Sequence, residues 1–166
     1  DQVMSQEAFA EVYRILKDEG VEKVWDPKKI AVLLDHYVPA PTVTQAEVHK
    51  FIREGVKKYR IAGWHDLKAG ICHQIMAEKG HILPGQLILG TDSHSTTYGA
   101  FGAAGTGIGV SEMAYVLATG ELWMRVPSTI QIVLKGGPPP MVPSQDVVLY
   151  LDREYSKEMD EYQSVE

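Results

Sequence analysis

Two pairs of acidic and imidazole side chains are the residues of this sequence most suited to chemistry. Asp35 is followed directly by His36, and Asp92 is followed two positions later by His94. A carboxylate can hold an imidazole in one tautomer and stabilise its charged form, which suits general acid–base catalysis near neutral pH. A third imidazole, His73, lies shortly after a glycine. These five residues predict a site for proton transfer.

Hydroxyl side chains surround the second pair. Residues 90–99 read Gly-Thr-Asp-Ser-His-Ser-Thr-Thr-Tyr-Gly, directly after an apolar run. Unpaired polar groups at a buried strand end cost free energy, so this composition favours a ligand site. The alternative is a polar turn in which Ser93 or Ser95 caps a helix.

The other three histidines are not predicted to belong to the site. His49, His65 and His81 fall on a predicted helix face or in loops. Histidines in such places are usually solvated, so we expect these three at the surface.

Several familiar sites are excluded by spacing. The glycines of residues 99–109 do not fit G-x-G-x-x-G, and the sequence contains no Walker-type loop and no G-x-S-x-G around Ser93. The single cysteine, Cys72, excludes a local cysteine metal site. Two interpretations of the glycine run remain: backbone N–H groups that face an anionic ligand, or close packing of a helix on a sheet.

Elements of two kinds must position these residues. The apolar run at residues 30–34 ends just before Asp35, and the run at residues 86–89 ends shortly before Asp92. Carboxyl ends of parallel strands share one edge, so the three imidazole segments should meet there. Further strands are expected at residues 1–4, 61–64 and 129–134, and helices at 5–20, 44–59, 111–119 and from 145. This alternation predicts a three-layer α/β/α fold with a mainly parallel sheet.

Individual residues predict where several helices begin and end. Ser5 and Ser144 are suitable N-caps, and Gly20 and Gly120 are suitable helix ends. The highly charged segment 152–166 is expected to be a solvated helix or a frayed end.

Length and charge limit the possible functions. The chain has 166 residues and a net charge of −6, which suits one domain over residues 1–166 and opposes a general nucleic-acid surface. No apolar run is long enough to span a membrane, and the start carries no signal-peptide pattern. We therefore expect a cytoplasmic protein with neither a membrane nor a nucleic acid as partner.

Four segments together resemble one enzyme family, the aconitase superfamily, and most closely the large subunits of 3-isopropylmalate dehydratases and homoaconitases. The segments are residues 24–27 (VWDP), 34–40 (LDHYVPA), 70–74 (GICHQ) and 85–127, which contains GTDSHSTTYGAFGAAGTGIG. The resemblance covers nearly the whole chain in register.

The resemblance implies a hydro-lyase that removes water from a hydroxy di- or tricarboxylate and adds it back with opposite regiochemistry. It implies a [4Fe–4S] cluster held by three cysteines and a small subunit that carries a swivelling domain. The implied catalytic residues are Asp35, His36, His73, Asp92 and His94, and the implied substrate-binding residues are Gln6 and Ser93. Isopropylmalate in leucine biosynthesis is the first expectation.

Two departures from the family pattern refine these expectations. Dehydratase subunits usually carry Thr-His-Asp-Gly where this chain has residues 5–8, SQEA, so substrates of the homoaconitase or aconitase type stay open. Cys72 matches no cluster ligand, and the cluster cysteines are expected beyond this chain. We therefore expect the chain to be the first α/β domain of a longer large subunit, inactive alone. A non-catalytic relic that binds a carboxylate anion and a protein that binds RNA are two further hypotheses.

Overall fold

The computed structural model describes residues 1–155 and 162–166. Its contacts divide the chain into two units, Asp1–Leu122 and Trp123–Glu166. The first unit contains every residue that the sequence predicts for the site.

A five-stranded, fully parallel sheet lies at the centre of the first unit, in the order β3-β2-β1-β4-β5. Its strands are β1 (Gln2–Ser5), β2 (Ile30–Leu33), β3 (Gly63–His65), β4 (Leu87–Gly90) and β5 (Ala104–Gly107). Strand β1 is central, because Val3 pairs with Ile30 of β2 on one side and with Leu89 of β4 on the other.

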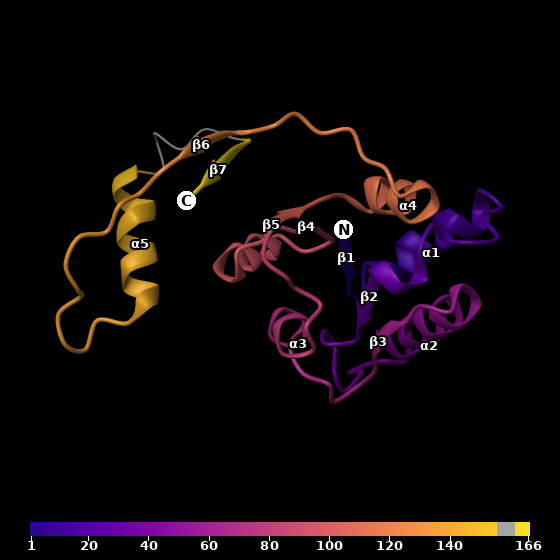
Figure 1. Ribbon diagram of the computed structural model, residues 1–166. Helices are drawn as coiled ribbons and strands as arrows, with labels where there is room; N and C mark the ends of the chain where they lie inside the picture. The colour runs from indigo at the N-terminus through magenta and orange to yellow at the C-terminus, as the bar shows by residue number, and fades with distance from the viewer. Residues whose placement is uncertain (156–161) are drawn as a thin grey trace. The chain divides into compact units, whose positions relative to one another are not determined.

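Helices cover both faces of this sheet, as Figure 1 shows. Helices α1 (Phe9–Asp18), α2 (Val43–Tyr59) and α4 (Val110–Thr119) pack on one face. Helix α3 (Cys72–Glu78) and the 3-10 helix η2 (Ser95–Phe101) pack on the other. Neighbouring strand residues alternate between the two cores, as when Val3 enters the first and Met4 the second. The predicted three-layer α/β/α architecture is confirmed.

Helix α1 starts later than the capping prediction places it. Its N-cap is Ala8, without a side-chain cap, whereas Ser5 is the last residue of β1. The Ser5 hydroxyl is instead 2.9 Å from that of Thr91. The prediction that Ser5 caps a helix is therefore wrong, because the strand ladder extends through it. The prediction for Gly120 is correct: it ends α4 with φ 78°.

The glycine run supplies a strand that the sequence analysis did not predict. Residues of β5 pair with β4, and two of its glycines lie against the segment after β4. A Cβ on Gly105 would collide with the Ser95 carbonyl oxygen, and one on Gly107 would lie 2.9 Å from the Asp92 carbonyl oxygen. The packing interpretation of the glycines therefore holds for this strand.

The unit Trp123–Glu166 has its own small sheet. Strands β6 (Ser128–Ile130) and β7 (Gln163–Val165) pair in parallel. Helix α5 (Ser144–Tyr155) has Ser144 as its first residue, whereas the prediction placed Ser144 before the helix as its N-cap. Strand β6 is shorter than the predicted 129–134. Residues 156–161 of the predicted charged tail lie outside the described residues.

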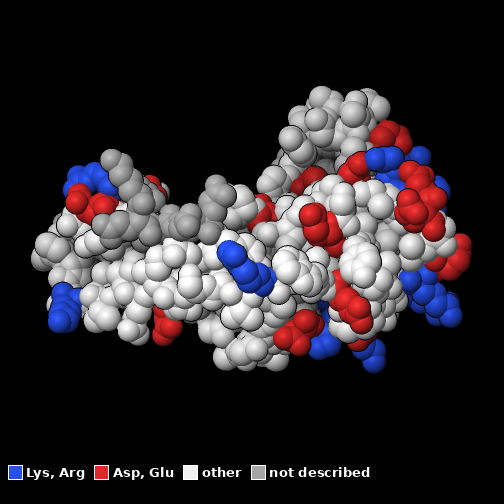
Figure 2. Space-filling model, turned by 90° about the horizontal axis from the view of Figure 1, so that it is seen from above, with Lys and Arg blue, Asp and Glu red and all other residues white. Residues whose placement is uncertain are grey.

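On the face seen in Figure 2, acidic and basic side chains are scattered among many uncharged ones, and this face shows no broad basic patch over the described residues. No helix among residues 1–155 and 162–166 is both long and apolar enough to cross a membrane.

The prediction that His49, His65 and His81 lie at the surface is wrong for His49 and holds only in part for His65 and His81. His49 of α2 is only 3% exposed. His65 and His81 are both partly buried and meet edge to face, with their Nε2 atoms 2.8 Å apart. Strand β3 and the segment that follows α3 bring these two rings together, which no local pattern reveals.

Acidification is expected to destabilise the fold through His65 and His81. Burial lowers the pKa of both rings below their ordinary value of 6.5. The unfolded chain therefore binds protons first as the pH falls below 6.5, and the free energy of unfolding decreases until the folded rings titrate. In H65Q and H81Q this pH dependence should flatten in urea denaturation. A wild-type slope in both variants would contradict the assignment.

Candidate active site at the carboxyl edge of the sheet

The predicted site residues gather at the carboxyl ends of three adjacent strands. Gln6 follows β1, Asp35 and His36 follow β2, and Asp92 follows β4. The chain winds from β1 to β2 and β3 on one side and returns to place β4 and β5 on the other. The ends of β1 and its neighbours thus form a topological switch point, where open α/β sheets bind ligands.

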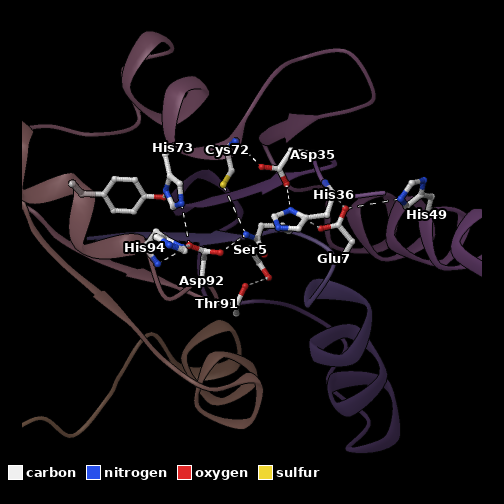
Figure 3. Close-up of polar contacts among 12 residues, drawn as sticks. Ser5, Glu7, Asp35, His36, His49, Cys72, His73, Thr91, Asp92 and His94 are labelled. Atoms are coloured by element: carbon white, nitrogen blue, oxygen red, sulfur yellow. Dashed lines mark hydrogen bonds and ion pairs between the residues drawn. The ribbon is translucent and has the colours of Figure 1, made fainter. Parts of the chain in front are cut away.

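Asp92 is the centre of a hydrogen-bonded cluster (Figure 3). Its Oδ1 lies 3.0 Å from Nε2 of His73 and accepts the backbone N–H of His94 at 2.7 Å. Its Oδ2 accepts the side-chain amide of Gln6 at 2.9 Å. Within this cluster, Asp92 therefore makes its shorter imidazole contact with His73. His94 Nδ1 is 3.3 Å from Asp92 Oδ1, a longer contact.

The expectation that His73 follows a strand, like the other two imidazole segments, is wrong. It lies in the first turn of α3, on the sheet face shared with η2. Its Nδ1 is 3.2 Å from the hydroxyl of Tyr98, and burial raises the pKa of that phenol, so the hydroxyl remains a donor. Tyr98 donating to Nδ1 leaves the ring proton on Nε2, facing Asp92. Both ring nitrogens of His73 are then engaged.

The cluster keeps Asp92 ionised. Burial acts to raise the pKa of Asp92, but hydrogen bonds from the His94 backbone and from Gln6, and the proximity of His73, outweigh it and lower the pKa. Gln6 itself is 5% exposed, so the amide that donates to Asp92 Oδ2 is a buried part of the cluster.

Ser93 and His94 occupy the exposed part of the cluster. The His94 side chain is 79% exposed, and Ser93 Oγ is 3.3 Å from its Nδ1. Among the described residues no hydrogen bond occupies Nε2 of His94. This nitrogen and the Ser93 hydroxyl are therefore available to a ligand.

Asp35 and His36 form the second acid–imidazole pair. Asp35 Oδ1 lies 2.9 Å from His36 Nδ1, and Oδ2 accepts the backbone N–H of Cys72 at 2.7 Å. The hydrogen bond to Asp35 raises the pKa of His36, although partial burial opposes it. The proton on Nδ1 leaves Nε2 for a ligand, since in the described part of the chain no group bonds to it.

Glu7 is a site residue that the sequence analysis did not identify. Its Oε1 accepts the backbone N–H of His36 at 2.9 Å, and its Oε2 is 3.3 Å from His36 Nδ1. In sequence it resembles any acidic residue near a helix start. Its position just after β1 was the only available signal.

Cys72 is unsuited to hold a metal as a thiolate. The side chain is 1% exposed, and burial, with Asp35 beside it, raises the pKa of the thiol to about 12. It is the only cysteine of the chain. The chain therefore lacks the three thiolates that an iron–sulfur cluster of the implied type needs.

Among the described residues, two groups of three have ligand atoms within 4.8 Å of one another: His73, Asp92 and His94, and Glu7, Asp35 and His36. Hydrogen bonds and ion pairs among these residues already account for the short distances within each group. What the site offers chemically is two ionisable imidazoles, His36 and His94, each with a free nitrogen and each beside a carboxylate.

The sequence is similar to those of a known enzyme family and of several curated proteins. The model of the aconitase family (aconitate hydratase) matches residues 6–166. The chain is 48% identical over 151 residues to 3-isopropylmalate dehydratase large subunit 1 of Methanopyrus kandleri, covering 91% of this chain and 36% of that protein. It is 45% identical over 135 residues to a probable methanogen homoaconitase large subunit of Methanosarcina mazei, and the match covers 81% of this chain and 34% of that protein. The 3-isopropylmalate dehydratase large subunit of Aquifex aeolicus is 44% identical to it over 137 residues, and this match covers 82% of this chain and 32% of that protein. The chain thus spans about a third of the length of these curated relatives.

Proposed function

Because the chain belongs to the aconitase family, we propose that it is the site-bearing first domain of a hydro-lyase large subunit. The reaction is dehydration and rehydration of a hydroxy di- or tricarboxylate. Relatives named 3-isopropylmalate dehydratase and homoaconitase support this class. Isopropylmalate is the first candidate substrate, followed by homocitrate and citrate.

The pairing of Asp35 with His36 is the observation that carries this proposal. Loss of a hydroxyl from carbon requires a proton for the leaving oxygen. The hydrogen bond with Asp35 is the first cause of the raised pKa of His36, and it stabilises the charged form of the ring. His36 can then donate from Nε2 to the leaving hydroxyl and, in the reverse step, take a proton from the attacking water.

The cluster around Asp92 supplies groups for substrate binding and for a second proton transfer. His94 presents a free Nε2 beside ionised Asp92, and the exposed Ser93 hydroxyl can donate to a substrate carboxylate. His73 and Gln6 act through Asp92, to which both are hydrogen-bonded. A direct contact of Gln6 with a substrate carboxylate stays a prediction.

A [4Fe–4S] cluster is implied by the family, but the residues of this chain do not fit it, since the one thiol is buried and protonated. Its cysteine ligands would belong to other parts of the longer polypeptide. When bound, such a cluster supplies a Lewis acid for a hydroxyl. The names of the relatives include "large subunit", which supports a small-subunit partner. A cytoplasmic location also stays a prediction.

The test is turnover by the complete large subunit assembled with its small subunit. We expect isopropylmalate to yield an unsaturated acid, detected by its ultraviolet absorbance, and we expect the 166-residue chain alone to be inactive. Homocitrate and citrate are assayed in parallel to assign the substrate. Carboxylate binding without turnover of any of the three by the iron-loaded complex would contradict the proposal and favour the relic.

A further inference from the structure

Glu7 and His49 form a second, buried acid–imidazole contact behind His36. Glu7 lies in the turn between β1 and α1 with 14% of its side chain exposed, and His49 lies on α2 with 3% exposed. His49 Nε2 is 3.9 Å from Glu7 Oε1. Figure 3 shows His49, Glu7 and His36 in one row that leads toward Asp35.

Glu7 contacts His36 through both of its oxygens. Oε1 accepts the His36 backbone N–H at 2.9 Å, and Oε2 is 3.3 Å from the ring Nδ1. Asp35 Oδ1 is 2.9 Å from the same Nδ1. Two carboxylates therefore face one ring nitrogen, an arrangement that places the proton on Nδ1 and directs Nε2 outward.

This arrangement is costly for Glu7 and His49. Burial raises the pKa of Glu7, and neither Glu7 Oε2 nor His49 Nε2 has a hydrogen-bond partner among the described residues. Buried polar atoms without a partner are uncommon, because their lost hydration is not replaced. An apolar residue at either position would avoid this cost, so the presence of a polar one beside a proton carrier indicates a function.

We propose that Glu7 and His49 are positioning residues that fix the tautomer of His36 and stabilise its charged form. Glu7 shares Nδ1 with Asp35, and His49 directs an N–H toward Glu7 and so favours its carboxylate form. The inference rests on the proposed function and deepens it, since it concerns the same proton carrier. It does not depend on which hydroxy acid is the substrate.

All titratable groups that face these residues enter the test. Asp35 from its own segment and Asp92 from the loop after β4 also favour the charged form of His36. Asp35 and His36 face Glu7. Besides Glu7, Asp66 from the loop after β3 is an acidic group that interacts with His49. Only Glu7 contacts both imidazoles among the described residues.

The direct test measures the pKa of His36 in the assembled complete enzyme, by deuterium exchange of the imidazole C–H followed by mass spectrometry. E7Q keeps a carbonyl oxygen for the His36 backbone and removes the charge. We expect His36 to titrate at lower pH, kcat to fall about tenfold with little change in KM, and the corresponding limb of the pH profile to move the same way. E47Q, the same change at an exposed residue of α2, should match the wild type.

The His49 variants separate positioning from packing. H49Q keeps an N–H donor and should retain the wild-type titration of His36, whereas H49L removes the donor and should shift it as E7Q does. If E7Q fails to fold, the comparison of H49L with H49Q carries the test. Unchanged His36 titration in both E7Q and H49L would overturn the proposal. Absence of turnover in the wild type would contradict only the proposed function, because the exchange measurement needs no activity.

Discussion

The D92N substitution is expected to lower kcat of the complete enzyme by about 10³-fold. Asp92 accepts hydrogen bonds from His73, Gln6 and the His94 backbone. Asparagine has one acceptor oxygen, so an N–H group would face at least one of these donors. The negative charge beside the imidazoles would also be lost. Steady-state kinetics with whichever of the three hydroxy acids the enzyme turns over provide the measurement.

The control for D92N is D18N, the same change at an exposed residue of α1 that pairs with Arg14. Surface ion pairs of this kind contribute little to stability, and kcat should remain at the wild-type value. A D92N enzyme within about threefold of wild type would show that the Asp92 cluster is not required for proton transfer.

The G105A substitution is expected to destabilise the fold by about 3 kcal/mol. A Cβ at this position of β5 would collide with the Ser95 carbonyl oxygen and lie 2.9 Å from Tyr98 Cβ. Both partners belong to η2, whose start lies three residues after Asp92. The backbone there must move, so activity should fall together with stability. Urea denaturation measures the first effect and kcat the second.

The matched control is G99A. Gly99 lies within η2, and a Cβ there meets no atom within 4 Å. Its free energy of unfolding should stay within about 0.5 kcal/mol of wild type. Equal stability of G105A and G99A would mean that the β5 contact does not hold the Asp92 segment in place.

The two acid–imidazole motifs explain why much of the site could be predicted from the sequence. Asp35 follows an apolar run, and Asp92 follows another, so the local pattern predicts that each lies at a strand end. Parallel order then required these ends to share an edge, and the structure has them there. Family resemblance added Gln6 and Ser93 as substrate-binding residues.

The sequence by itself determined the elements and the chemical types at their ends, because period and turn residues are local properties. Only the tertiary structure decided which side chains pair. Asp92 approaches His73 more closely than His94, although His94 is nearer in sequence, because α3 packs beside η2. Glu7 reaches His36 across 29 positions, and His49 is buried although its helix pattern suggested a solvated face. These contacts depend on the order of the strands in the sheet and on the close approach of the β5 glycines to the segment after β4. Neither can be read from a short stretch of sequence.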